Sequence, residues 1–165
     1  MTESLEGYAL SHKCFLQLKP GTHTMTRTVP KAPGKVKLVI GNGGGHDPGT
    51  PGQIGYGLYD MVSLGDVFAC QSGRKLLEAI KELDDGSPVL LTIANHAGDV
   101  MNGQMACRKA KAAGINIESV IHYDDVTSAP KGSEKERRGV GGIFFPTKAA
   151  GAAAEEGATL EECIR

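Results

Sequence analysis

Residues 36–48 read Val-Lys-Leu-Val-Ile-Gly-Asn-Gly-Gly-Gly-His-Asp-Pro, and the rest of the chain is organised around this stretch. Its first part, Val36 to Ile40, is a largely apolar run that predicts a buried strand. Four glycines then fall within residues 41–45, where the backbone can turn sharply and approach a ligand without a Cβ in the way. His46 and Asp47 directly follow that turn. Ligands of open α/β sheets bind beyond the carboxyl ends of the strands, so we expect a small, oxygen-rich ligand here.

The same stretch also has a purely structural interpretation. Glycine runs are common in surface loops, and residues 48–52, Pro-Gly-Thr-Pro-Gly, have the composition of a loop. The run matches neither the dinucleotide-binding fingerprint nor the P-loop, because no Gly-Lys-Ser/Thr follows it. On its own, the glycine turn leaves both a ligand site and an ordinary loop open.

Composition predicts one ordinary globular domain. The chain has 165 residues, 40% of them hydrophobic, and a formal charge of −1, which gives no electrostatic case for nucleic acid or an anionic membrane. It shows no apolar run of membrane-spanning length and no signal peptide. The cysteines are far apart and form no CxxC pair, so we expect no zinc site, no disulfide framework and a reducing cytoplasm. They are Cys14, Cys70, Cys107 and Cys163.

Strands alternate with helices along the chain. This pattern predicts an α/β fold: a single domain with a three-layer, mostly parallel sheet and helices on both faces. The expected elements are a short helix within 2–19, a connecting arm over 20–34, a strand over 35–40, a helix over 53–63, a strand over 66–70, a helix over 73–83, a strand over 89–93, a helix over 99–113, a strand over 115–121, an exposed loop over 126–138, a Gly/Ala-rich helix over 140–156 and a new helix capped by Thr159 and Glu162.

Three polar turns, which contain His46, Asp99 and Asp124, follow predicted strands. The carboxyl ends of parallel strands share one edge, so these turns are expected to converge on a site. Each residue also has a structural interpretation: a loop histidine satisfied by backbone, a helix N-cap and a simple turn, respectively. No cluster has metal-ligand spacing, so we expect this chain itself to hold no metal.

An ordered set of motifs identifies a family resemblance. From about residue 30 to the C-terminus, the chain is similar to the dihydroxyacetone kinase K subunit. The motifs are Pro33-Gly-Lys-Val, the glycine turn with His46-Asp-Pro, Gly65-Asp-Val-Phe, Asn95-His-Ala-Gly-Asp-Val-Met-Asn, Asp124-Asp-Val, Arg137-Arg-Gly-Val and Lys148-Ala-Ala-Gly-Ala-Ala-Ala-Glu.

The resemblance implies phosphoryl transfer to a terminal hydroxyl of a short ketose. In that family the K subunit binds the sugar, and an L subunit carries ATP and magnesium; in some bacteria a phosphotransferase-system protein recharges the nucleotide. A K subunit has two α/β halves, and residues 1–165 resemble the first, N-terminal half. The implied partners are a small ketose, a separate second-half K chain and an L subunit, in a homo- or hetero-oligomer.

The resemblance also implies roles for individual residues. His46 matches a histidine that hydrogen-bonds the sugar oxygens, and Asp99 matches the carboxylate that acts as base for the attacking hydroxyl. Gly43 matches a glycine whose backbone touches the sugar. Cys70 replaces a family serine that helps to hold the sugar, and Ala94 replaces a family lysine. The histidine that binds the ketone covalently belongs to the second half.

Three functions are therefore compatible with the sequence. The first is the sugar-binding subunit of a split dihydroxyacetone or tetrulose kinase, which transfers phosphate only when all its parts are mixed. The second is a stand-alone isomerase of small sugars, with His46 and Asp99 as an acid–base pair, which turns over without nucleotide. The third is a non-catalytic sensor, which binds a ketose without turnover.

Overall fold

The structure is a computed structural model that describes residues 1–165. Its elements, in chain order, are α1 (Thr2–Ser11), β1 (Leu16–Leu18), β2 (Thr24–Arg27), β3 (Lys37–Gly44), the 3-10 turn η1 (Pro51–Gln53), β4 (Met61–Val67), α2 (Gly73–Leu83), β5 (Val89–Ala94), α3 (Ala97–Ala112), β6 (Ile117–His122), the 3-10 turns η2 (Glu134–Glu136) and η3 (Gly141–Ile143), α4 (Phe144–Glu156) and α5 (Leu160–Ile164).

The strands form one six-stranded sheet in the order β1-β2-β4-β3-β5-β6. The four strands from β4 to β6 in that order run parallel, and β1 and β2 are added antiparallel at one side. The predicted α/β class with a mostly parallel sheet is confirmed. Because the four parallel strands point the same way, the loops that leave them all lie at one edge of the sheet.

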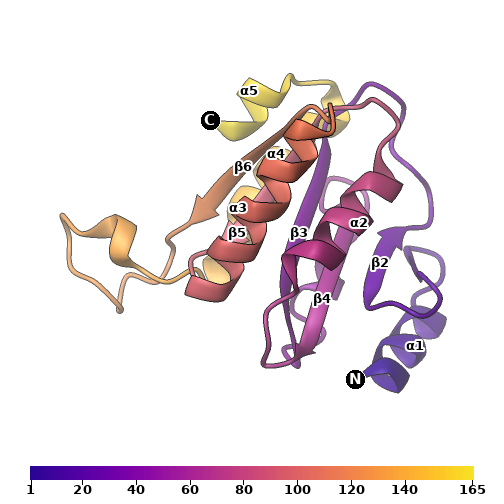
Figure 1. Cartoon of the computed structure of the whole chain (residues 1–165), viewed down its shortest axis with the longest axis horizontal. Helices are drawn as coiled ribbons and strands as arrows, with labels where there is room; N and C mark the ends of the chain where they lie inside the picture. Colours follow the sequence, from indigo (N-terminus) through magenta and orange to yellow (C-terminus); the bar gives the residue numbers. More distant parts are fainter.

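Helices cover both faces of the sheet, as the sequence predicts. On one face α2 and α3 lie side by side (Figure 1) over a core cluster that includes Val39, Leu91 and Ile93. The opposite face packs against α1, α4 and α5 through a second cluster, which includes Leu38 and Leu90. Leu38 and Val39 are adjacent in β3 and belong to opposite clusters, which is the alternation expected of a central strand.

The prediction of a helix over 53–63 is wrong, and so is that of a separate strand over 66–70. One strand, β4, occupies Met61–Val67 instead, after a loop. Gly55 and Gly57 in that loop have φ values of 146° and 68°, which a right-handed helix does not contain. The first five residues of β4 are buried, as in a strand covered on both faces, so they show no alternation, and Met61 and Val62 together with Ile54 and Leu58 imitate helical spacing.

The first 34 residues also hold more strand than predicted. The helix ends at Ser11, and β1 follows it within the range 2–19. The expected connecting arm over 20–34 contains β2, which pairs with β4. Both strands are only three or four residues long, so neither repeats an alternating pattern often enough to be recognised from sequence.

Several predicted helix boundaries are confirmed. The Ser72 side chain accepts the Lys75 N–H at the start of α2. The box between Thr159 and Glu162 forms as expected and opens α5. The Gly/Ala-rich helix begins at Phe144, four residues later than predicted, because the 3-10 turn η3 precedes it.

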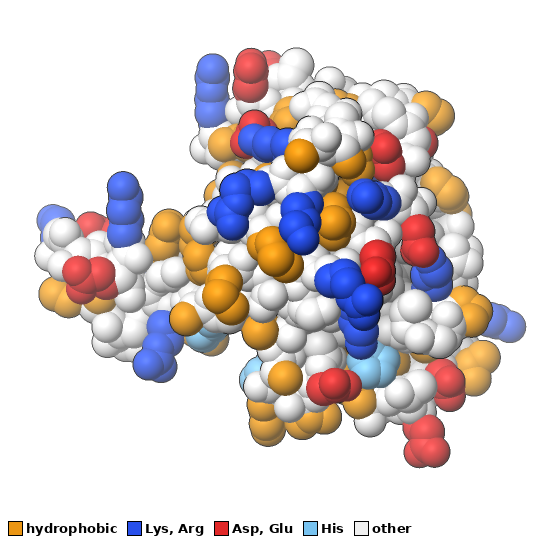
Figure 2. Space-filling model, in the orientation of Figure 1, with side chains coloured by type: hydrophobic (Ala, Val, Ile, Leu, Met, Phe, Trp, Pro, Cys, Tyr) orange, Lys and Arg blue, Asp and Glu red, His pale blue; other side chains and the backbone are white.

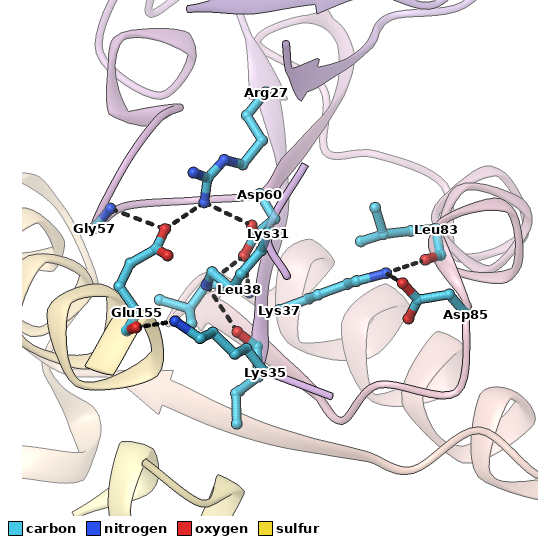
Figure 3. A network of polar contacts seen from close by, with 11 residues as sticks. Arg27, Lys31, Lys35, Lys37, Leu38, Gly57, Asp60, Leu83, Asp85 and Glu155 are labelled. Atoms are coloured by element: carbon cyan, nitrogen blue, oxygen red, sulfur yellow. Dashed lines mark hydrogen bonds and ion pairs between the residues drawn. The ribbon is translucent and has the colours of Figure 1, made fainter. Parts of the chain in front are cut away.

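A buried charge network holds the edge of the sheet opposite the polar strand ends (Figure 3). Asp60, just before β4, accepts hydrogen bonds from Arg27 Nη1 at 3.2 Å, Lys31 Nζ at 2.8 Å and the Leu38 N–H at 2.8 Å. Glu155 on α4 accepts a second bond from Arg27. All four charged side chains are buried, and their charges balance. The network therefore ties β2, the segment before β3 and α4 to the start of β4.

Charge is unevenly distributed over the surface. Lys and Arg side chains gather over α2 and α3 on the face shown in Figure 2. The exposed cationic residues of these helices are Arg74, Lys75, Lys81, Arg108, Lys109 and Lys111. This face is more positive than the formal net charge of −1 suggests. No helix combines the length and apolar character that crossing a bilayer requires.

Candidate functional site

The glycine run is not the turn that the sequence predicts: it continues β3 as far as Gly44, and it packs closely against the neighbouring loop. A β-carbon on Gly44 would lie 2.8 Å from the Gly65 carbonyl oxygen, so no side chain fits there. Gly45 adopts φ 87°, a left-handed conformation that glycine tolerates best. Asn42 ties the end of β3 to the following loop, because its side chain accepts the Gly43 N–H at 2.9 Å and donates to Thr50 Oγ1 at 3.0 Å. Gly43 and the following residues are therefore held in a fixed arrangement.

His46 lies exposed beyond the carboxyl end of β3. Its imidazole ring is 5.2 Å from the Phe68 ring, centroid to centroid, with 52° between the ring planes. Phe68 belongs to the turn after β4, so two neighbouring loops meet at this pair. The imidazole makes no hydrogen bond to another group of the chain. The structural interpretation of His46, a loop histidine whose ring is hydrogen-bonded to backbone groups, is therefore wrong.

Cys70 lies past the end of β4, in the turn that leads to α2, and not in the strand predicted for it. Its Sγ atom accepts a hydrogen bond from Asn102 Nδ2 at 3.4 Å. A β-carbon on Gly98 would lie 2.6 Å from the same sulfur atom. The thiol therefore lies against the first turn of α3, at Gly98, which precedes Asp99 in the sequence.

Asp99 is the third residue of α3 and is only 8% exposed. His96 holds the N-cap position, and Oδ1 of Asp99 is buried without a hydrogen-bond partner, so the N-cap interpretation of Asp99 is wrong. Burial raises the pKa of this carboxyl above its usual range, and the nearby His96 acts in the opposite direction. A carboxylate with a raised pKa and a free oxygen is suited to accept a proton.

The structure brings the predicted residues to one edge. The order β4-β3-β5 puts the His46 loop between the Cys70 turn and the start of α3, which carries Asp99. Direct contacts join the three segments, because a β-carbon on Gly43 would lie 3.3 Å from the Ala69 carbonyl oxygen while Cys70 packs on Gly98. Gly43, His46, Cys70 and Asp99 therefore lie on one continuous rim.

The third polar turn supports this rim. Asp124 accepts the N–H groups of Val140 at 2.9 Å and Gly142 at 2.8 Å, and so positions the start of α4. A β-carbon on Gly139 would lie 2.7 Å from both the Asn95 nitrogen and the His122 carbonyl oxygen, so this loop lies directly on the ends of β5 and β6. The rest of the loop extends away from the body of the molecule, in orange in Figure 1.

His96 and Phe68 are site-edge residues that the sequence prediction missed. His96 is exposed, its Nε2 donates to the Gly139 carbonyl at 2.8 Å, and its proximity lowers the pKa of Asp99. Phe68 carries no polar group that would single it out. Its only sequence signal is that it ends the Gly65-Asp-Val-Phe motif of the family resemblance.

Comparison with known proteins identifies the family. The model of the Dak1 domain matches residues 6–165. The chain belongs to the Dak1 family. It is 40% identical over 160 residues to the dihydroxyacetone-binding subunit DhaK of a PTS-dependent dihydroxyacetone kinase from Listeria innocua, covering 97% of this chain and 48% of that protein. It is 36% identical to D-erythrulose kinase from Mycolicibacterium smegmatis, covering 99% of this chain and 28% of that protein. The predicted resemblance is confirmed.

Solved structures of Dak1-like proteins have the same fold. The native dihydroxyacetone kinase of C. freundii superposes with a TM-score of 0.87 at 30% identity, over 99% of this chain and 30% of that one. The dihydroxyacetone kinase operon co-activator Dha-DhaQ superposes with a TM-score of 0.88 at 27% identity, over 98% of this chain and 49% of that one. The chain thus spans about half or less of the length of the proteins that it matches.

This Dak1 domain has no preformed metal cluster. No group of three or more His, Cys, Asp or Glu side chains is placed to hold a metal ion. The one buried carboxylate on the rim is Asp99, and Mg²⁺ in proteins usually takes one or two carboxylates together with waters and phosphates. A structure of the C. freundii kinase in complex with AMP-PNP and Mg2+ also superposes on this chain, over 30% of that kinase.

Proposed function

We propose that this chain is the sugar-binding N-terminal half of the K subunit of a dihydroxyacetone-type kinase. The observation that carries the proposal is the rim on which His46, Cys70 and Asp99 converge, in a member of the Dak1 family. A short ketose such as dihydroxyacetone or erythrulose matches the rim chemically, because it offers several oxygens within a few ångströms. The relatives' names, which include dihydroxyacetone and erythrulose kinases, support the same substrate class.

In the proposed reaction Asp99 takes the proton of a terminal ketose hydroxyl. That oxygen then forms a bond to the terminal phosphorus of ATP, and the bond between this phosphorus and the ADP oxygen breaks. His46 donates a hydrogen bond to the ketose carbonyl or accepts one from a hydroxyl, and the Gly43 backbone lies against the sugar. Such a transfer depends mainly on positioning and charge stabilisation, which is what a packed rim supplies.

Partner chains complete the proposed enzyme. Magnesium and ATP supply the phosphoryl group and neutralise its charge, and we assign both to a separate L subunit because this chain offers no suitable metal cluster. A second K half would contribute the rest of the sugar site, since this chain spans 48% of its Listeria relative. The working unit is then a hetero-oligomer.

The test is a kinase assay with dihydroxyacetone or erythrulose, ATP and magnesium, in which this chain, a second-half chain and an L subunit are mixed singly and together. Transfer is expected only in the complete mixture. Asp99→Asn should reduce the rate of transfer by roughly 10²- to 10⁴-fold, which is the usual contribution of a general base to the rate. The matched control is Asp84→Asn, at an exposed position after α2. Transfer by the complete mixture at the normal rate with Asp99→Asn contradicts the assigned role.

One observation favours a second function, a ketose sensor. The co-activator Dha-DhaQ superposes on this chain as well as the kinase does, with TM-scores of 0.88 and 0.87. A sensor would bind ketose with no turnover in any mixture. The isomerase alternative would instead convert a sugar without nucleotide, so the same set of assays separates the three functions.

A further inference from the structure

Phe68 has two features that are unfavourable in an ordinary loop residue. It is the only non-glycine residue with a positive φ, at 54°. Its side chain is 76% exposed, although it is a large hydrocarbon ring. A left-handed conformation is strained for a residue with a Cβ, and such strain concentrates at functional sites.

Contacts from both sides hold this conformation in place. The Phe68 N–H donates to the Gly44 carbonyl at 2.9 Å, and the next N–H, that of Ala69, donates to the Asp66 carbonyl at 3.0 Å. A β-carbon on Gly45 would lie 3.4 Å from the Phe68 ring and 3.1 Å from Val67. The turns after β3 and β4 are therefore packed and hydrogen-bonded against one another, and these contacts fix the orientation of the Phe68 ring.

The ring is aimed at His46. The two centroids are 5.2 Å apart, within the range of favourable aromatic pairs, and the 52° tilt is intermediate between stacked and edge-to-face. Because the imidazole makes no hydrogen bond within the chain, this contact is the side-chain restraint that the structure gives it.

We propose that Phe68 is a positioning residue for His46. Its ring restricts the imidazole to one orientation toward the rim and keeps water from one side of it. The strained backbone at Phe68 is then part of the site, because a relaxed turn would aim the ring elsewhere. The inference rests on the proposed role of His46 in ketose binding.

The test compares Phe68→Ala and Phe68→Gly with wild type and with Phe68→Tyr. Both small variants lack the ring, and only glycine relieves the left-handed strain, so Phe68→Gly should unfold at a higher midpoint than Phe68→Ala. Both should bind dihydroxyacetone roughly two- to tenfold more weakly than wild type, the effect expected from one aromatic contact. Phe68→Tyr should restore binding. Phe15→Ala, which removes an exposed aromatic residue before β1, is the control and should bind normally.

A spectroscopic measurement on the free protein separates this inference from the proposed function. The carbon-bound imidazole protons of His46 should lose a ring-current shift in both small variants and keep it in Phe68→Tyr. If wild type binds no short ketose, the proposed function fails, and these resonances alone decide whether Phe68 positions His46. Unchanged His46 resonances in Phe68→Ala and Phe68→Gly overturn the inference, as does unchanged ketose binding by both variants.

Discussion

The sulfur atom of Cys70 lies against Gly98, one residue before Asp99: a β-carbon on Gly98 would approach it to 2.6 Å. This contact joins the turn after β4 to the start of α3, although the two are 28 residues apart in sequence. It places the thiol against the helical turn that carries Asp99, to which the proposed function assigns the proton transfer. A substitution at Cys70 should therefore change the effect on stability of a substitution at Gly98.

Gly98→Ala should therefore depend on the residue at position 70. In wild type the new methyl group forces Cys70 to move, and the variant is expected to unfold more easily. In the Cys70→Ala background the clash is gone, and the helix preference of alanine over glycine, about 1 kcal/mol, should make the same substitution neutral or stabilising. Urea unfolding of the four proteins gives the coupling, which we expect to be about 0.5–3 kcal/mol. Additive effects would mean that the two groups do not touch.

Asp99→Asn should stabilise the protein in a pH-dependent way. Burial raises the pKa of Asp99, so the folded state holds this proton more tightly than the unfolded chain, in which the pKa is near its ordinary value of 3.8. Wild type therefore loses stability as the pH rises from that value through the folded pKa. At pH 7 the variant should have the higher urea midpoint.

The two curves should approach each other below about pH 3, where the carboxyl is protonated in both states. Unfolding midpoints measured between pH 3 and pH 8 provide the comparison. A constant difference between the two proteins across this range would show that the carboxyl is not held in a desolvated position.

Asp60→Ala should be among the most destabilising substitutions in the chain. It leaves the Lys31 ammonium, which has no exposed side-chain area, without its carboxylate partner. Removal of one partner of a buried ion pair typically costs about 3–5 kcal/mol. Glu78→Ala is the matched control, because its pair with Arg74 spans 3.9 Å with both side chains largely exposed, and such pairs contribute about 0–1 kcal/mol. Equal losses for the two variants would contradict the buried network.

Gly139→Ala should detach the loop that lies on the ends of β5 and β6. Its β-carbon would meet only backbone atoms, at 2.7–2.9 Å, and backbone cannot rotate out of the way. Overpacking of this kind costs about 1–3 kcal/mol. Gly141→Ala is the control, because its β-carbon would meet nothing within 4 Å. Hydrogen exchange at the Val140 and Gly142 amides should rise in the first variant alone, and equal exchange in both would contradict the packing.

Regular elements with strong periodic or capping signals could be predicted from sequence. The strand at β5, the helices α2 and α3 and the cap at Thr159 each have a local pattern that matches the structure. β4 could not be predicted, because a strand buried on both faces has no alternation, and its apolar residues, together with Ile54 and Leu58, imitate a helical repeat.

The site was predictable to the extent that it depends on topology. His46 and Asp99 share an edge because parallel strands end together, and that rule requires only the order of the elements. The contacts between Cys70 and Gly98 and between Phe68 and His46 depend on loop conformation, which no local pattern specifies. The missing partner of Asp99 Oδ1 likewise follows from three-dimensional packing alone.

Ketose binding at the rim is tested most directly by titrating the isotope-labelled chain with dihydroxyacetone and with erythrulose while the amide and imidazole NMR signals are recorded. If the rim binds short ketoses, perturbations caused by at least one of these sugars should cluster at Gly43, His46, Phe68, Cys70 and Asp99, and His46→Ala should abolish them. No binding of either sugar, or perturbations centred on the opposite edge of the sheet around Asp60, would contradict ketose binding at the rim.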